Sequence, residues 1–264
     1  MPMLPVTGGE LYYEDRGDGE RSIVFAHGAG GNHMSWWQQV PHFSQRYRCI
    51  TIDHRGFGQS LDHSGEGVRA YPRDLEELLD HLGVASTAII AQSMGGFTGM
   101  TFAGRHPERV WALVMANTFL GVGDEDLMAK AREHWANLAQ IDPGGPAYEQ
   151  TNMVGDRFKR EHPERLFLYQ QVRALNPPID LPEGYTVEDG AVPVADLANL
   201  DVPVLFLAGE EDGTIPIELT AAAQQHVAGS RMERVPEAGH SLYWEMPELF
   251  NARVDAFFDE VLGA

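Results

Sequence analysis

Cysteine is almost absent from this 264-residue sequence: Cys49 is the only one, so no disulfide can form within the chain. Its neighbours in "RCITID" are apolar and typical of a β-strand, which predicts a buried structural thiol rather than a reactive one. A chain without disulfides suits a reducing compartment, and we expect a cytoplasmic protein.

Basic residues are also scarce, since 19 Lys and Arg stand against 39 Asp and Glu, which gives a net charge of −20. Such a charge repels phosphate backbones and anionic membranes, so we expect no binding to nucleic acid or membrane. Long apolar runs are missing too, because no segment approaches the roughly 20 residues that span a bilayer. The start, "MPMLPVTGGE", lacks the basic and apolar regions of a secretion signal. The expected partner is a small-molecule substrate, and the expected state is a monomer or a homodimer.

Short apolar runs of the buried-strand type alternate with longer helix-like segments. The predicted strands cover residues 22–28, 48–56, 87–93, 110–118 and 202–210. Their near-continuous apolar character is typical of a parallel sheet that is buried on both faces. Residues 3–17 differ, and they predict an antiparallel edge hairpin that turns at Gly8-Gly9. We therefore predict an α/β fold with a mostly parallel, twisted sheet of about eight strands and helices on both faces.

The helical segments are of two kinds. Residues 70–83 carry a stripe of leucines at helical spacing with Gly83 as a stop, and residues 95–105 form a second predicted helix. Between about residues 121 and 200, helical stretches and a proline-rich exit (176–193) replace the buried strands. Because the strand pattern resumes at residue 202, we predict a helical cap over residues 121–199. Residues 1–120 and 200–264 then form the core, into which the cap is inserted without being an independent domain.

Residues with catalytic chemistry follow the predicted strands. In open parallel sheets, ligands and catalytic groups gather beyond the carboxyl ends of the strands. The segments found there are "HGAGG" (27–31), "DHRGFGQS" (53–60), "AQSMGG" (91–96), "AGEEDGTIP" (208–216) and "AGHSLYWEMPE" (238–248). Together they supply a hydroxyl, carboxylates, an imidazole and glycine-rich backbone, as nucleophilic catalysis by serine requires.

These five segments, in this order, resemble the α/β-hydrolase superfamily along nearly the whole chain, in particular its capped serine esterases and lactonases. The resemblance implies that Ser93 is the nucleophile, that His240 is its general base, and that Asp212 orients the imidazole. It also implies an oxyanion hole made by the backbone N–H groups of Ala29 and Met94.

The sequence departs from the family at the turn that holds the serine. Ala91 replaces the usual first glycine of G-x-S-x-G. Small residues are needed there because the serine occupies a strained strand-to-helix turn with crowded neighbours. A methyl group is the smallest intrusion, and some lipases resemble this sequence in carrying alanine.

Several other residues compete for roles at the site. Glu210 and Glu211 adjoin Asp212, but the spacing within the acid loop favours the aspartate. Some relatives place the acid after the preceding strand, where this chain has Asn117, which cannot act as an anion. Asp53 is expected to be structural and to tie its turn together.

A second histidine, His27, precedes the glycines of "HGAGG". We expect it to brace the oxyanion loop through hydrogen bonds rather than to shuttle protons.

The residues expected to bind substrate are mostly apolar. They are Gly28, Trp36, Trp37, Trp135, Met153 and Phe158. This composition predicts a small or medium, largely apolar ester or lactone that is cleaved through an acyl-enzyme. Alternatives on the same scaffold are C–C bond hydrolysis, perhydrolysis, and a small-molecule receptor with slow hydrolase activity. Neither a metal nor an organic cofactor is implied.

Overall fold

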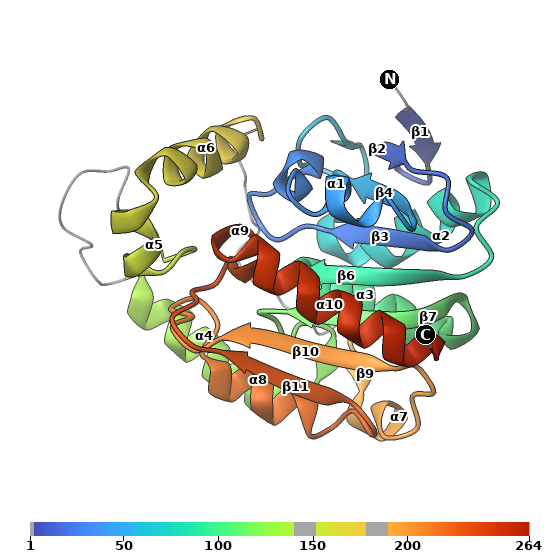
Figure 1. Ribbon diagram of the computed structural model, residues 1–264. Coiled ribbons are helices and arrows are strands. Elements are labelled where there is room, and N and C mark those ends of the chain that lie inside the picture. The colour runs from blue at the N-terminus through green and yellow to red at the C-terminus, as the bar shows by residue number, and fades with distance from the viewer. Residues whose placement is uncertain (1–2, 140–151, 178–189, 264) are drawn as a thin grey trace.

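The computed structural model describes residues 3–139, 152–177 and 190–263. Its main element is a nine-stranded sheet (Figure 1). The strands are β1 (Met3–Val6), β2 (Gly9–Arg16), β3 (Ser22–Ala26), β4 (Arg48–Ile52), β5 (Leu61–Asp62), β6 (Thr87–Gln92), β7 (Val110–Ala116), β10 (Val204–Gly209) and β11 (Arg231–Val235). Their order is β1-β2-β4-β3-β6-β7-β10-β11, and β5 pairs with β2. All neighbours from β4 to β11 are parallel, so the predicted mostly parallel α/β sheet is confirmed.

The central strands are buried over their whole length, because apolar side chains cover both faces of the sheet. Each predicted strand extends beyond the observed one by the loop residues that follow it. Cys49 lies in β4 and is fully buried. Burial raises the pKa of its thiol to about 12, which confirms the prediction of a structural cysteine.

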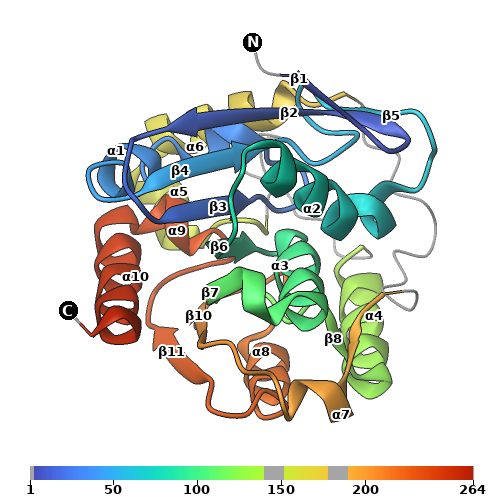
Figure 2. The same ribbon diagram turned by 90° about the vertical axis from the view of Figure 1, so that its right-hand side faces the viewer.

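Helices pack on both faces of the sheet, and Figure 2 shows α1 and α10 on one side and α2, α3 and α8 on the other. The elements are η1 (His33–Trp36), α1 (Val40–Phe43), η2 (Gly67–Ala70), α2 (Tyr71–His81), α3 (Gly95–Arg105), η3 (Pro107–Arg109), α8 (Ile217–Gln224), α9 (Leu242–Glu245) and α10 (Pro247–Leu262). The predicted leucine stripe is confirmed in α2, where Leu75, Leu78 and Leu79 are fully buried. Gly83, with a φ of 64°, follows the helix as predicted.

The amino-terminal segment forms the predicted antiparallel edge hairpin, β1 with β2. Gly8 takes the positive φ that the turn requires, 79°, while Gly9 is already the first residue of β2. Strand β2 then pairs antiparallel with β4 and joins the hairpin to the parallel sheet.

Residues 121–199 leave the sheet after β7 and return to it at β10. Their described elements are β8 (Val122–Gly123), α4 (Glu125–Leu138), α5 (Asp156–Glu161), α6 (Pro163–Ala174), β9 (Val192–Pro193) and α7 (Val194–Leu197). Helices α5 and α6 lie beyond the carboxyl ends of the parallel strands (Figure 1). Most of the predicted proline-rich exit, residues 178–189, lies outside the described residues.

The parallel pair of β8 and β9 was not expected from the sequence. Each strand has two residues, too few to show a strand pattern. The buried Val192 of β9 docks on α3, where a Cβ on Gly104 would lie 2.4 Å from a methyl of Val192. None of the described helices combines the length and apolar composition needed to cross a bilayer.

Candidate active site

Ser93 occupies a sharp turn between β6 and α3 and is partly exposed. Its φ of 49° lies in the left-handed region, which few non-glycine residues adopt. The strained backbone is held on both sides: the Ser93 N–H donates to the Ala116 carbonyl (3.1 Å), and the Ser93 carbonyl accepts from the Gly96 N–H (2.8 Å) and the Thr118 hydroxyl (2.8 Å). Such a turn projects the serine side chain away from the sheet, as a nucleophile requires.

Glycines on α3 explain how this turn accommodates Ala91. A Cβ placed on Gly99 would lie 2.9 Å from the Cβ of Ala91, so the methyl group of the strand occupies the space that a side chain on the helix would need. Two further glycines of α3 face equally close neighbours, since a Cβ on Gly95 would lie 2.2 Å from the Ala26 carbonyl and one on Gly96 would lie 2.4 Å from the Thr118 hydroxyl. Ala91 therefore fits because the opposing residue is Gly99.

A buried carboxylate–imidazole pair lies beyond β10 and β11. His240 Nδ1 is 2.8 Å from Asp212 Oδ2 and 3.0 Å from Oδ1. Oδ1 also accepts the N–H groups of Thr214 (2.9 Å) and Ile215 (2.8 Å), which hold the carboxylate in its loop. Of the three adjacent acidic residues, Asp212 is buried against the histidine, whereas the two glutamates are exposed.

Asn117 completes the surroundings of Asp212 and was not assigned a role from the sequence. Its Nδ2 donates to Asp212 Oδ2 (3.0 Å) and to the Gly239 carbonyl (3.2 Å). The residue is fully buried and has a φ of 49°, a conformation that asparagine tolerates better than most residues. Its position after β7 was the available signal, because relatives can place their acid there.

The other ring nitrogen of His240, Nε2, is buried and has no hydrogen-bond partner within the described parts of the chain. The Nδ1–Asp212 contact leaves Nε2 as the nitrogen that can accept a proton. The turn that carries Ser93 contacts the same loop, since the Gln92 Nε2 donates to the His240 carbonyl (3.2 Å). The turn that carries Ser93 is thus joined to residues 236–241, the histidine loop.

Glu245 supports the histidine loop through hydrogen bonds to backbone N–H groups. Its Oε2 accepts the N–H groups of Gly239 (3.0 Å) and Gly155 (3.0 Å), and its Oε1 accepts that of Ser241 (3.2 Å). Burial raises the pKa of this carboxyl group, and the three N–H donors oppose that rise. The segment "AGHSLYWEMPE" contains this glutamate, but the sequence gave no indication of its contacts.

The segment 27–31, the predicted oxyanion loop, begins with the buried His27. The His54 N–H donates to His27 Nε2 (2.9 Å), so Nδ1 carries the proton and donates to the Gly28 carbonyl (2.8 Å). Burial lowers the pKa of His27 to about 4 and keeps the ring neutral. The predicted bracing role of this histidine is confirmed.

The predicted oxyanion donors, Ala29 and Met94, directly follow two residues that lie close together, Gly28 and Ser93. Gly28 lies against the serine turn, because a Cβ at position 28 would be 2.9 Å from the Ser93 Cβ. Neither the Ala29 N–H nor the Met94 N–H donates to another group within the described parts of the chain. Both N–H groups are therefore without an acceptor from the described residues.

Asp53 ties the next turn together, as predicted. Its Oδ1 accepts the His33 N–H (2.6 Å), its Oδ2 accepts the Gln59 N–H (2.8 Å), and its carbonyl accepts the Ser60 hydroxyl (2.6 Å). The carboxylate is fully buried and joins its own turn to His33 of η1, whose Nδ1 also lies 2.8 Å from Oδ1.

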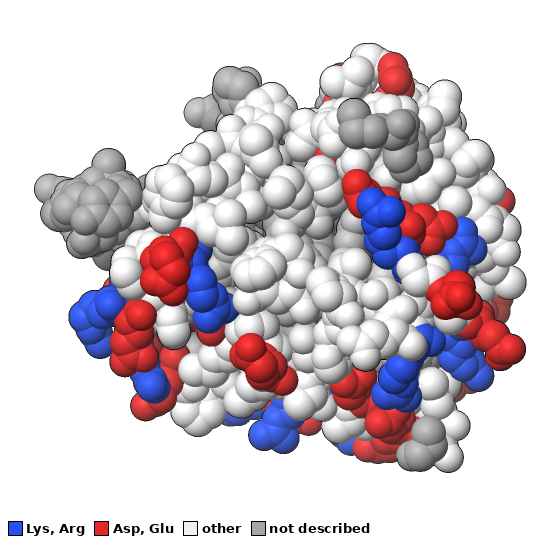
Figure 3. Space-filling view, turned by 45° about the horizontal axis from the view of Figure 1, so that its top comes forward, with Lys and Arg blue, Asp and Glu red and all other residues white. Residues whose placement is uncertain are grey.

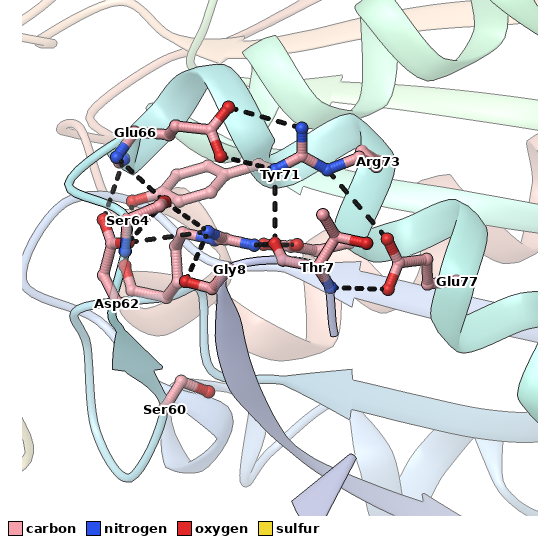
Figure 4. A network of polar contacts seen from close by, with 12 residues as sticks. Thr7, Gly8, Ser60, Asp62, Ser64, Glu66, Tyr71, Arg73 and Glu77 are labelled. Carbon is pink, nitrogen blue, oxygen red and sulfur yellow. Dashed lines mark hydrogen bonds and ion pairs between the residues drawn. The ribbon is translucent and has the colours of Figure 1, made fainter. Parts of the chain in front are cut away.

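Arg55, two residues later, is buried in an ion pair with Asp74 of α2. It also donates to the carbonyls of Thr7 (3.0 Å) and Gly8 (3.3 Å). Figure 4 shows this network continuing through Asp62, Ser64, Glu66, Arg73 and Glu77. The network anchors the 53–60 turn to α2 and to the edge hairpin.

A cavity lies between the oxyanion loop and α6. It is lined by Gly28, Ala29, Gly30, Gly31, Ser35, Gln92, Tyr169, Val172, Arg173, Tyr243 and Trp244. Gly28 is the one residue of the predicted substrate-binding set in this lining, and the assignment of the others stays a prediction. Trp36 is fully buried against Phe25 and Tyr243, below the loop rather than beside the cavity.

The remaining predicted wall residues are spread around the site. Trp37 is 45% exposed and packs its ring against Trp244. The indole of Trp135 donates to the Thr214 carbonyl (2.8 Å), beside the acid loop, and Met153 lies against the same threonine. Phe158 is buried under the guanidinium of Arg165.

A parallel sheet with a serine on a strand-to-helix turn, beside a buried carboxylate–imidazole pair, defines a hydrolase-type fold. Comparison with known proteins identifies the family, because residues 21–148 match the family model described as alpha/beta hydrolase fold. The 3-oxoadipate enol-lactonase 2 of Acinetobacter baylyi is 30% identical over 257 residues, which cover 93% of this chain and 92% of that protein. The chain belongs to the α/β-hydrolase superfamily.

Solved structures agree with this assignment. Est816, described as an N-acyl homoserine lactone degrading enzyme, is 26% identical with a TM-score of 0.78, over 97% of this chain and 100% of its own. A thermophilic esterase from Thermogutta terrifontis is 26% identical with a TM-score of 0.75, over 96% of this chain and 94% of its own. Lactonases and esterases are thus similar to this chain over nearly its full length.

Proposed function

We propose that the protein is a serine hydrolase of carboxylic esters or lactones that works through an acyl-enzyme. The observation that carries the proposal is the buried His240–Asp212 pair, in a loop hydrogen-bonded to Gln92 beside Ser93. Within the described residues, His240 Nε2 has no partner and is left to accept a proton. The lactonases and the esterase named above support the ester or lactone bond as the target.

The proposed reaction follows from the placement of these groups. His240 Nε2 takes the proton of the Ser93 hydroxyl as its oxygen attacks the substrate carbonyl, and Asp212 stabilises the imidazolium that forms. The N–H groups of Ala29 and Met94 then stabilise the oxyanion, each by on the order of 3 kcal/mol. His240 returns the proton to the leaving alkoxide, and a water activated by the same imidazole hydrolyses the acyl-enzyme.

The proposed substrate is small or medium and largely apolar. On the face in Figure 3, acidic and basic side chains are interspersed around the margin, and the described residues at its centre are neither. Residues 121–199 are proposed to act as a cap, with Trp135, Met153 and Phe158 among the residues that shape the pocket. This proposal rests on the position of α5 and α6 beyond the strand ends (Figure 1).

A panel of p-nitrophenyl esters and lactones tests the proposal. We expect Ser93→Ala to lower kcat by about 10³-fold or more, because the nucleophile is lost. Ser86→Ala, immediately before the other end of β6, is the matched control and should retain wild-type kcat. Residual turnover by Ser93→Ala close to that of the wild type would contradict the assignment.

The acid is tested separately. Asp212→Asn should lower kcat by about 10⁴-fold, because the amide favours the wrong imidazole tautomer. An unchanged rate would show that another group orients His240.

A further inference from the structure

The carboxyl-terminal part of α6 is hydrogen-bonded to the oxyanion loop. Arg173 Nη1 donates to the Ala29 carbonyl (3.1 Å), and Asn176 Nδ2 donates to the Gly30 carbonyl (2.7 Å). In the opposite direction, Asn32 Nδ2 donates to the Val172 carbonyl (2.9 Å). A helix from residues 121–199 therefore contacts the backbone of the loop that carries a proposed oxyanion donor.

These bonds act on consecutive peptide units. The carbonyl of Gly28 is held from the core by His27 Nδ1 (2.8 Å) and the Gly31 N–H (2.9 Å). The next two carbonyls, of Ala29 and Gly30, are held by α6. Glycine-rich backbone rotates its peptide planes at little cost, so this segment needs external contacts to keep one orientation. The plane of the Gly28 carbonyl also carries the Ala29 N–H, and the next two planes are held by Arg173 of α6 and by Asn176, two residues beyond it. The second of these planes carries the Gly31 N–H, which donates to the Gly28 carbonyl.

The contacts are specific to the residues present. A Cβ on Gly30, which has a φ of 79°, would lie 2.5 Å from Arg173 Nη1, so the guanidinium packs directly on that glycine. Asn176 also accepts the Gly58 N–H through its Oδ1 (2.8 Å), which links the oxyanion loop to the 53–60 turn. Arg173 has no ion-pair partner within the described parts of the chain, and its guanidinium donates to the neutral Ala29 carbonyl.

The same helix also contacts the histidine loop. The Tyr169 hydroxyl lies 3.0 Å from the Ser241 hydroxyl, next to His240, and the guanidinium of Arg173 lies 5.9 Å from the Tyr169 ring centre. Helix α6 thus spans both loops that supply proposed catalytic groups.

We propose that Arg173 and Asn176 are positioning residues that fix the two peptide planes after the one that carries the Ala29 N–H, so that the Gly31 N–H stays bonded to the Gly28 carbonyl and the Ala29 N–H stays aimed at the reacting carbonyl. The inference rests on the proposed function, in which the Ala29 N–H stabilises the oxyanion. It adds that part of the active site is assembled by residues outside the sheet and its loops.

The test uses the full-length chain with Arg173→Ala, Asn176→Ala and the conservative Arg173→Lys. We expect each alanine variant to lower kcat by about 10- to 100-fold with KM within about twofold, because only the transition state uses the oxyanion donor. Affinity for an alkyl trifluoromethyl ketone, which forms a tetrahedral adduct with serine, should fall by the same factor, whereas affinity for the alcohol product should not change. Arg173→Lys keeps a donor and should recover most of the rate.

Two control variants should match the wild type. Gln171→Ala alters the exposed side of α6, and Arg253→Ala removes the same charge from α10. A rise in KM with unchanged kcat would overturn the proposal, since Arg173 would then contact substrate. Equal losses of adduct and product affinity would also overturn it, since the variants would then be generally damaged.

Hydrogen exchange of residues 27–32 separates this proposal from the function on which it rests. Exchange should rise in both alanine variants, and unchanged exchange would overturn the positioning role. If Ser93→Ala retained full hydrolysis, the proposed function would fail, while the exchange result would still report whether α6 holds the loop.

Discussion

At the ends of the neighbouring strands β7 and β10, Asn117 and Asp212 lie with their side chains 3.0 Å apart. The sequence predicts Asp212 as the acid of the site by its spacing within residues 208–216, and it excludes Asn117 because an amide is not an anion. The sequence does not reveal that the amide serves as a hydrogen-bond donor to that carboxylate, because the contact joins residues 95 positions apart. Asn117 therefore belongs to the site although it lacks the charge that sequence reasoning sought there.

The near-isosteric change Asn117→Asp replaces this donor with a second carboxylate. We expect the free energy of unfolding at pH 8 to fall by on the order of 2 kcal/mol, because a buried donor is lost and two like charges meet. The new carboxyl group should have a raised pKa in the folded state, so the penalty should shrink as the pH falls toward 5. Urea unfolding at both pH values measures this difference. A penalty that grows on acidification would contradict the expectation.

Ala91 shows a second limit at this scale. The family pattern marks it as a departure, but the compensating residue, Gly99, is identified only when β6 and α3 are packed together. Ala91→Gly should lower the free energy of unfolding by about 1–2 kcal/mol, through the lost methyl burial and the added backbone entropy. We expect kcat to stay within about twofold. A large loss of activity would mean that the methyl group shapes the serine turn itself.

At the scale of elements, α2 and α3 were predicted to within two residues, because a leucine stripe and Gly83 mark α2, and Gly95 and the "HPER" segment bound α3. The helical character of residues 152–175 was also predicted, and the structure divides it at His162-Pro163 into α5 and α6. The contacts of α6 with the oxyanion loop form when the helix packs on the core. The spacing of apolar residues within α6 does not show where that packing occurs.

The packing of α3 on β6 predicts a coupling between two substitutions. Gly99→Ala should destabilise the protein by about 1–3 kcal/mol, because the new methyl group overlaps Ala91 and Leu113. In the double variant Ala91→Gly/Gly99→Ala part of this overlap is removed, so the double cost should be smaller than the sum of the single costs. Thermal and urea unfolding of the four proteins measure the coupling. Simple additivity would show that Leu113 alone makes the overlap.

The link between α5 and the histidine loop gives another prediction. Glu245→Gln replaces an oxygen that accepts backbone N–H groups with an NH₂ group that cannot. We expect kcat to fall by about tenfold, because the backbone on both sides of His240 loses its support. Glu248→Gln, in the exposed first turn of α10, is the matched control and should leave kcat unchanged. Equal losses of kcat in Glu245→Gln and Glu248→Gln would contradict a specific role of Glu245.

At the scale of the whole molecule, apolar strand runs and the order of the five loop segments were enough to predict the α/β class and the parallel sheet. The central strands can be recognised in the sequence because each must be apolar on both faces and so forms a continuous apolar run. The net charge of −20 also bears on the whole chain, but it does not place any charge in space. The buried histidines at positions 27 and 54 give the pH response a more specific cause.

The neutral, buried His27 should make stability depend on pH. Its pKa is about 4 in the folded state and about 6.5 when unfolded, so the unfolded chain binds more protons between these values. Stability is then full above pH 6.5 and is lost as the pH falls toward 4. From pH 7 to pH 5 the loss from this residue is about 2 kcal/mol. Burial also lowers the pKa of His54, so its effect has the same sign.

Urea unfolding of the wild type and of His27→Gln at pH 7 and pH 5 checks this. The variant should lose about 2 kcal/mol less than the wild type over that interval. Equal losses would show that His27 does not carry the acid sensitivity.

The short pair of β8 and β9 has a consequence for the history of the protein. It joins Val122 to Val192 and Gly123 to Pro193, so both ends of a long excursion are fastened side by side on α3. With the ends fixed, each doubling of the connecting length costs only about 0.6 kcal/mol in closure entropy. The β8–β9 pair therefore allows the segment between Gly123 and Val192 to be exchanged during evolution without changes to the sheet. If that segment caps the site as proposed, exchanging it at this junction should change the substrate range and leave the sheet intact.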